Sequence, residues 1–139
     1  MNTIWSDFVQ NTGTLYSSRM LRFSDAYMAA YRKIFDIDGR KRFLEIGCGP
    51  GTLAQALARW YPGAEVIGID RDAAFAQYAA QQAPHIQFLE EAAAALPFED
   101  GTFDVTISNT VQEHMEPSAF LGEQYRVLKE GGVCLVLSA

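Results

Sequence analysis

Residues 42–51 read RFLEIGCGPG, a short apolar run that leads directly into a glycine-rich turn. The next ten residues carry Leu53, Leu57 and Tyr61 four apart, which is the spacing of one helix face. Strand, glycine turn and helix in this order let the backbone approach a ligand closely, because glycine adopts positive φ and has no side chain to collide. The stretch therefore predicts a parallel sheet with a ligand site at the end of its first strand.

The rest of the chain alternates between short apolar runs and helical patterns, which is typical of βαβ units. We predict strands at residues 42–46, 64–69, 85–89, 103–108 and 133–137, and helices at residues 51–61, 73–82 and 117–129. Asp72 is expected to cap the second helix. The third is expected to present Leu121, Tyr125 and Leu128 to the sheet and to end at Gly131 and Gly132. Residues 92–98 read as a loop.

The N-terminal residues 2–35 read as helical, with a break at residues 11–14. Their apolar side chains are predicted to gather on one face: Met20, Phe23, Tyr27, Tyr31, Ile34 and Phe35. We divide the chain into a helical cap, residues 1–39, and a main domain, residues 40–139. The predicted fold class is α/β, a Rossmann-like doubly wound parallel sheet with an N-terminal helical cap.

Composition limits the partners that the chain can have. Its 139 residues include 17 acidic and 11 basic side chains, for a net charge of −6, so the cationic field that holds nucleic acid is lacking. No apolar run reaches the length of a membrane span. Cys48 and Cys134 have no partner at metal-ligand or redox spacing, so we expect reduced thiols, no metal site and a cytoplasmic protein.

The glycine spacing separates two kinds of nucleotide site. The dinucleotide fingerprint G-x-G-x-x-G would require glycine at Thr52, whereas Gly51 comes one residue early, which disfavours an NAD-linked oxidoreductase. Glu45 places a carboxylate beside the turn, where it would repel a pyrophosphate and attract the ammonium group of an amino acid. The alternative for Glu45 is a strand residue that faces solvent.

Asp70 follows the second predicted strand, at the edge of the sheet where ligands bind in parallel α/β folds. A carboxylate in this position can accept two hydrogen bonds from ribose hydroxyls. The alternative is that Asp70 caps the following helix, a role for which Asp72 is better placed. We therefore predict that Asp70 binds ribose.

Four segments resemble, in order, the motifs of class I S-adenosylmethionine (SAM)-dependent methyltransferases of the type 11 family: residues 43–52, 66–70, 96–105 and 125–132. The resemblance implies the strand order 3-2-1-4-5. Members of the family usually continue past the fifth strand, so this chain resembles a version without the sixth and seventh strands. The open fifth-strand edge predicts either a longer protein or a homodimer.

The resemblance also implies roles for individual residues. Glu45 with Gly47, Cys48, Gly49 and Gly51 would hold the methionine moiety, Asp70 the ribose, and Arg71 would flank the adenine. Ala92 stands where the family has an acidic residue that binds the adenine amine, although Glu90 and Glu91 lie just upstream, and Ala93 would offer its backbone N–H. Asn109 and Thr110 would form the floor under the sulfonium. His114 is either a base or a residue that only packs or caps.

The predicted reaction is an in-line methyl transfer to a small-molecule acceptor, with S-adenosylhomocysteine as product and alignment as the protein's main contribution. Tyr16, Arg19 and Arg22 would belong to a lid, from which an arginine would meet the methionine carboxylate. The alternative function is a truncated or inactive SAM-binding module that acts through binding or dimerisation. An NAD-linked oxidoreductase is the least favoured interpretation.

Overall fold

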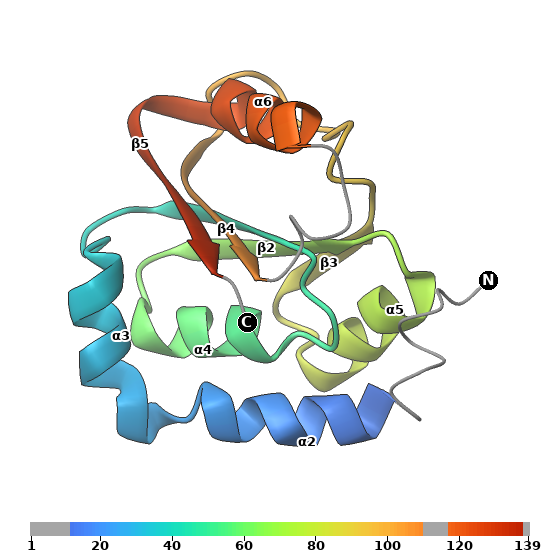
Figure 1. The fold of residues 1–139 in the computed structure, drawn as a ribbon. Coiled ribbons are helices and arrows are strands. Elements are labelled where there is room, and N and C mark those ends of the chain that lie inside the picture. The colour runs from blue at the N-terminus through green and yellow to red at the C-terminus, as the bar shows by residue number, and fades with distance from the viewer. Residues whose placement is uncertain (1–11, 110–116, 138–139) are drawn as a thin grey trace.

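The computed structural model describes residues 12–109 and 117–137. Within these residues lies a parallel sheet of five strands in the order β3-β2-β1-β4-β5 (Figure 1). The strands are β1 (Arg42–Ile46), β2 (Glu65–Asp70), β3 (Gln87–Glu90), β4 (Phe103–Asn109) and β5 (Leu128–Leu137). The predicted α/β class and strand order are confirmed.

The two faces of the sheet belong to two cores. Phe43 of β1 packs with residues of α4 (Thr52–Trp60), whereas Leu44 and Ile46 pack on the other face with residues of α6 (Pro117–Val127). This alternation follows from the two-residue period of a strand. Helices α4 and α5 (Ala73–Gln82) lie on one side of the sheet and α6 lies on the other (Figure 1). Because all strand pairs are parallel, their carboxyl ends meet at one edge.

The N-terminal cap consists of α2 (Thr12–Arg22), the 3-10 turn η1 (Asp25–Tyr27) and α3 (Met28–Phe35). Helix α2 runs along the outer side of α4 and α5 (Figure 1), and its Tyr16 ring meets the Tyr78 ring of α5 at a centroid distance of 5.6 Å. The predicted break at residues 12–14 is wrong, because α2 includes Gly13. A glycine costs a helix only about 1 kcal/mol, too little to end it. Residue 11 lies outside the described residues.

The predicted apolar stripe of the cap is wrong in part. Phe23 and Phe35 are buried in the core that α4 shares, and Tyr31 stacks on Trp60 at 5.4 Å. The turn at η1 interrupts the helical period, so positions before and after it do not share one face. Three predicted members of the stripe are therefore exposed: Met20, Tyr27 and Ile34.

Helix α6 presents a different face from the predicted one. Phe120, Gln124 and Val127 are buried, whereas Leu121 and Tyr125 are 48% and 84% exposed. Gln124 faces inward because its Oε1 accepts a hydrogen bond from the buried Thr106 hydroxyl at 3.0 Å. The two alternative stripes have the same spacing, so periodicity does not choose between them.

Helix α6 ends at Val127, within two residues of its predicted end, but the predicted start of the fifth strand at residue 133 is wrong, because β5 begins at Leu128. Gly131 and Gly132 lie inside β5 and do not end the helix. The β4–β5 register shifts irregularly around them, and Gly131 has φ of 77°. The remaining strands and helices begin and end within two residues of the predicted bounds, and residues 92–98 form a loop. No helix within the described ranges is long and apolar enough to cross a membrane.

Candidate ligand-binding site

The glycine loop, residues 47–51, joins β1 to α4 at the carboxyl edge of the sheet. Gly47, Gly49 and Gly51 have φ of 70°, 53° and 93°, a region that other residues rarely enter. A Cβ at Gly51 would lie 2.8 Å from the Cβ of Ala79 on α5. The predicted glycine turn is confirmed, and Gly51 also allows the loop to pack directly on α5.

The Asp70 side chain links the glycine loop to the end of β2 by a hydrogen bond. Its Oδ2 accepts a hydrogen bond from the Gly49 N–H at 2.9 Å, and its Oδ1 accepts one from the Asp72 N–H at 2.8 Å. Burial raises the pKa of the Asp70 carboxyl, and these two N–H donors oppose the rise. Asp72 caps α5, as predicted, by accepting from the Ala74 N–H at 3.0 Å. Each Asp70 oxygen keeps lone-pair capacity for a further donor.

Glu45 is the penultimate residue of β1 and is 1% exposed, so the solvent-facing alternative is wrong. Oε1 of its carboxyl group has no hydrogen-bond partner among the residues that the structure describes. Burial raises the pKa of Glu45 well above its usual value, and the positive charge of Arg19 opposes the rise. A buried acceptor without a partner costs free energy, so it marks a place where a donor would bind.

Arg19 of α2 covers the glycine loop. A Cβ at Gly49 would lie only 2.6 Å from Nη1 of Arg19, so a larger residue there would have to displace the guanidinium. Burial lowers the pKa of the Arg19 guanidinium, and the nearby carboxylates of Glu45 and Asp70 oppose that effect. One guanidinium of the cap therefore lies beside both acidic side chains of the site.

The other two residues that the sequence assigned to a lid, Tyr16 and Arg22, do not lie at Gly49. Arg22 is exposed, and its guanidinium stacks on the Phe23 ring at 5.2 Å from the centroid. The Tyr16 hydroxyl donates to Oε1 of Gln55 on α4 at 3.4 Å. Of the two arginines considered from sequence, the structure therefore brings Arg19 to the glycine loop.

Cys48 lies near both acidic groups, and Arg71 follows Asp70 in the sequence. Cys48 is buried, and this burial raises the pKa of its thiol well above the usual value, so the thiol is neutral. Arg71 is exposed immediately after Asp70. Within the described residues, no group of three or more His, Cys, Asp and Glu side chains is placed to hold a metal ion.

The β3–β4 loop, residues 91–102, starts beside Asp70. The Glu91 N–H donates to the Asp70 carbonyl at 3.0 Å. Ala92 is exposed, and Ala93 packs partly against the core on the α6 side of the sheet. The two alanines predicted from sequence therefore follow the end of β3, which pairs with the end of β2 that carries Asp70.

Asn109 is the last residue of β4, at the same edge of the sheet. Thr110 and His114 lie outside the described residues. Ser108 precedes Asn109, pairs with Ile46 across the sheet, and has a buried Oγ without a partner in the described part of the chain. Sequence reasoning missed Ser108, because a serine inside an apolar strand gives no sign of its surroundings.

A family model described as a methyltransferase domain matches residues 44–136. The chain belongs to this methyltransferase family. The demethylmenaquinone methyltransferase of Thermus thermophilus is 42% identical over 102 residues, which cover 70% of this chain and 46% of that protein. The fatty-acid O-methyltransferase of Mycolicibacterium smegmatis is 35% identical over 108 residues, which cover 75% of this chain and 39% of that protein. The chain thus spans less than half the length of either relative.

Among solved structures, a candidate S-adenosyl-L-methionine-dependent methyltransferase from Methanococcus maripaludis has a TM-score of 0.78. The match covers 94% of this chain and 63% of that chain, at 22% sequence identity. At this level of identity, the likeness concerns the fold. It agrees with the strand order of the methyltransferase domain described above.

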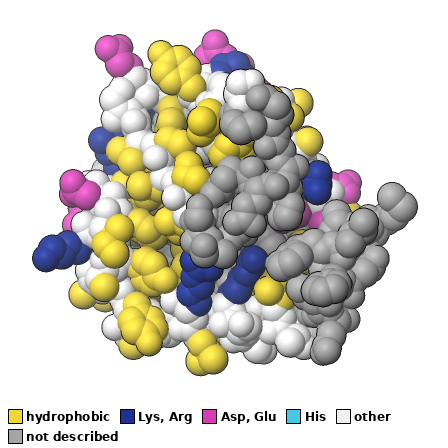
Figure 2. All heavy atoms as spheres, viewed as in Figure 1, with side chains coloured by type: hydrophobic (Ala, Val, Ile, Leu, Met, Phe, Trp, Pro, Cys, Tyr) yellow, Lys and Arg dark blue, Asp and Glu magenta, His cyan; other side chains and the backbone are white. Residues whose placement is uncertain are grey.

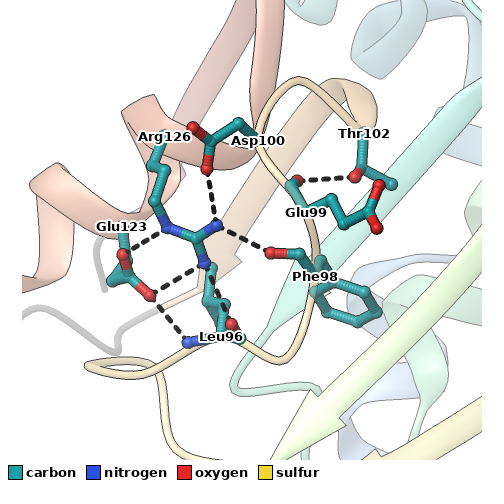
Figure 3. A network of polar contacts seen from close by, with 7 residues as sticks. All are labelled: Leu96, Phe98, Glu99, Asp100, Thr102, Glu123 and Arg126. Atoms are coloured by element: carbon teal, nitrogen blue, oxygen red, sulfur yellow. Dashed lines mark hydrogen bonds and ion pairs between the residues drawn. The ribbon is translucent and has the colours of Figure 1, made fainter.

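Two residues of α6 that sequence reasoning missed hold the β3–β4 loop of this methyltransferase domain (Figure 3). Arg126 donates to the Leu96 carbonyl at 2.9 Å and to the Phe98 carbonyl at 2.7 Å. Glu123 accepts from Nε of Arg126 at 2.8 Å and from the Leu96 N–H at 2.8 Å. We call this pair the loop clamp. In the sequence the pair appears only as a Glu and an Arg three positions apart on a predicted helix. This spacing predicts that they are neighbours on the helix, but not which loop they bind.

Proposed function

We propose that this chain is the SAM-binding domain of a methyltransferase that acts on a small-molecule acceptor and releases S-adenosylhomocysteine. The observation that carries the proposal is the buried Glu45 carboxyl, whose Oε1 has no partner among the described residues and which lies next to the glycine loop. An ammonium group is the donor that such an oxygen attracts. The methionine end of SAM carries one.

The residues present fit the methionine end of the cofactor. Glu45 would meet the ammonium group, and Arg19 would meet the carboxylate through a charge-assisted hydrogen bond. The loop adopts positive φ at three glycines, which have no side chains, so its backbone could approach a ligand closely. The backbone that would line the methionine belongs to Gly47, Cys48, Gly49 and Gly51.

The nucleoside end would lie along the ends of β2 and β3. Asp70 would accept ribose hydroxyls with the lone pairs that its two backbone hydrogen bonds leave. Arg71 would flank the adenine, and the Ala93 N–H would meet a ring nitrogen. Ala92 has no carboxylate for the adenine amine. Losing that hydrogen bond costs on the order of 1 kcal/mol of affinity.

The cofactor supplies an activated methyl group when bound. The chain's own contribution is alignment and exclusion of water, because Glu45, Arg19 and Asp70 would fix the cofactor at both ends and α2 covers the glycine loop. Asn109 and Thr110 would lie under the sulfonium. His114 stays a candidate base, and its alternative role is packing or capping ahead of α6.

Both curated relatives named above are methyltransferases whose names specify small-molecule acceptors, demethylmenaquinone and fatty acids. We therefore propose a small-molecule acceptor for the whole protein, with residues 1–39 as its lid and residues 40–139 as its SAM-binding domain. The net charge of −6 argues against a nucleic-acid partner. Two free cysteines agree with a reducing, cytoplasmic location.

A second copy of the chain is a further proposed partner. Among the described strands, β5 pairs with β4 on one side, and its other edge is open. Hydrophobic side chains gather over the part of the surface that carries β5 (Figure 2), and Val136 of this strand is 42% exposed. The open apolar edge supports a homodimer.

The alternative function is a SAM-binding module without turnover. Release of S-adenosylhomocysteine in the presence of a candidate acceptor would separate the enzyme from the module. An NAD-linked oxidoreductase would be favoured only if NAD raised the unfolding temperature of the protein and SAM did not.

Titration calorimetry with Arg19→Ala and Arg22→Ala tests the proposed site. We expect R19A to weaken SAM binding roughly tenfold, the effect of one lost charge-assisted hydrogen bond. R22A should bind like the wild type, because Arg22 stacks on Phe23 and lies exposed. Absence of wild-type binding at millimolar SAM would contradict the proposed function, and equal affinities of R19A and the wild type would remove Arg19 from the site.

A further inference from the structure

The loop clamp uses the full donor capacity of one guanidinium. Arg126 makes five hydrogen bonds: two to Glu123, and one each to Asp100, the Leu96 carbonyl and the Phe98 carbonyl (Figure 3). A guanidinium has five N–H donors in a rigid planar fork. Because every donor is used, the side chain has one orientation that satisfies all its partners. Hydrogen bonds from Arg126 and from the Leu96 N–H hold the pKa of Glu123 below its usual value, so Glu123 stays ionised.

The clamp fixes one end of a short stretch, residues 92–95. Leu96 gives both its backbone groups to the clamp, and its side chain is only 6% exposed. The other end is fixed at β3, where the Glu91 N–H donates to the Asp70 carbonyl at 3.0 Å. Between these anchors the stretch forms a turn, in which the Ala95 N–H donates to the Ala92 carbonyl at 3.2 Å.

The stretch between the anchors consists of four alanines, residues 92–95. No side chain in it can donate or accept a hydrogen bond. Any polar recognition by this stretch must therefore come from backbone N–H and carbonyl groups. A backbone donor cannot adjust as a long side chain does, and hydrogen bonds weaken steeply with poor distance or angle. The position of the two anchors thus sets what the stretch can recognise.

We propose that Arg126 and Glu123 are positioning residues for adenine recognition, because they hold the backbone of Ala92 and Ala93 where it can read the base. The inference rests on the proposed cofactor and deepens it. The clamp does not touch the ligand. It acts through Leu96, whose position fixes the backbone of Ala92 and Ala93. The selectivity for adenine that an acidic side chain at position 92 would give therefore comes from backbone groups.

The test compares Arg126→Lys, Arg126→Ala and Glu123→Gln with the wild type. The first readout is the ratio of dissociation constants for S-inosylhomocysteine and S-adenosylhomocysteine. The inosyl compound has a carbonyl in place of the adenine amine and a proton on the ring nitrogen N1, so that N1 cannot accept a hydrogen bond from a backbone N–H. We expect the wild type to favour the adenosyl compound roughly five- to tenfold, the effect of about one hydrogen bond. The ratio should fall toward one in R126A. R126K should restore little, because an ammonium group does not reproduce the planar fork.

Arg59→Ala is the matched control. Arg59 also binds a carboxylate, at 3.0 and 3.1 Å to Asp25, and its side chain is 40% exposed against 32% for Arg126. It has no contact with the β3–β4 loop among its hydrogen bonds in the described residues. A loss of stability alone would lower the unfolding temperature of R59A and R126A without changing the ratio of dissociation constants in either.

Hydrogen exchange of the free protein supplies a readout that needs no ligand. Amides of residues 92–96 should exchange faster in R126A and E123Q than in the wild type and R59A. Unchanged hydrogen exchange of residues 92–96 in R126A would overturn the proposed positioning role and leave the proposed cofactor standing. The same conclusion would follow if R126A and the wild type bound both compounds with the same ratio of dissociation constants. A wild type that binds neither compound at millimolar concentration would overturn the proposed cofactor, and the adenine assignment with it.

Discussion

At the scale of single residues, Glu45 places a titratable carboxyl in the interior beside Asp70. Its pKa in the folded chain is well above the ordinary value of 4.5, because burial disfavours the ionised form. The stabilising contribution of a group with a raised folded pKa is fully present below its unfolded pKa, and it is lost as the pH rises through the folded pKa. Without a ligand, ionisation of Glu45 therefore opposes folding.

Glu45→Gln removes this titration and keeps the shape of the side chain. We expect the unfolding free energy of E45Q to exceed that of the wild type by about 1–3 kcal/mol at pH 8, the cost of a buried unpaired polar group. The difference should shrink as the pH falls toward 4.5, and urea unfolding at several pH values measures it. Glu65→Gln is the control, because Glu65 is 60% exposed and pairs with Arg42. A difference between E45Q and wild type that does not change with pH would contradict the argument.

The acidic residues and the glycines of the site could be predicted from the sequence because their positions follow from local order. Each lies at or next to a strand end, and the carboxyl ends of parallel strands share one edge. Arg19 and Arg22 were harder to separate. They lie on one helix, three positions apart, and which of them reaches Gly49 depends on how α2 sits across α4 and α5. That placement is a tertiary property, which local order does not contain.

At the scale of elements, the glycine loop joins α4 and also packs on α5. Gly51 has φ of 93°, and a Cβ there would lie 2.8 Å from Ala79 and 3.1 Å from the Phe88 ring. Gly101 has φ of 64°, but a Cβ there would have no neighbouring atom within 4 Å. A comparison of alanine substitutions at the two glycines therefore separates the free-energy cost of a positive φ from the cost of steric crowding.

We expect Gly101→Ala to lower the unfolding free energy by about 1–2 kcal/mol through φ alone. Gly51→Ala should lower it further, by about 1–3 kcal/mol from overpacking between α4 and α5. Thermal or urea unfolding of both variants measures the difference. Equal losses in the two would show that the loop yields to the extra methyl group, and that Gly51 is required only for its backbone conformation.

The buried face of α6 shows why a helix can be predicted from the sequence when the face that it turns to the sheet cannot. Sequence periodicity predicts the helix, but it does not separate the predicted Leu121 stripe from the stripe that is buried, because both have the same spacing. The structure buries Gln124 because Thr106 of β4 supplies its hydrogen bond. The partner lies on another element, so no window of sequence around α6 contains it. The same holds for the loop clamp, whose partners lie almost thirty positions away.

At the scale of the whole molecule, the sheet has two edges with different chemistry. The β3 edge is four residues long and carries Gln87 and Glu90, and both features protect an edge from pairing with another chain. The β5 edge is ten residues long and ends in the apolar run at residues 133–137. If the chain associates with a second copy through its sheet, β5 is therefore the edge that we expect it to use.

Val136→Lys places a charge on this edge. Leu21→Lys places one on α2, a helix that lies on the outer side of α4 and α5 (Figure 1), and Leu21 is 75% exposed. We expect light scattering after gel filtration to show concentration-dependent dimers for the wild type and L21K, and monomers for V136K, because a lysine at a strand edge opposes pairing by its charge and hydration. Wild-type monomers at about 100 µM, a concentration at which a micromolar complex would be almost fully formed, would contradict pairing through β5. Dimers that persist in V136K would place the interface elsewhere, and the apolar side chains of the cap would then be the next surface to alter.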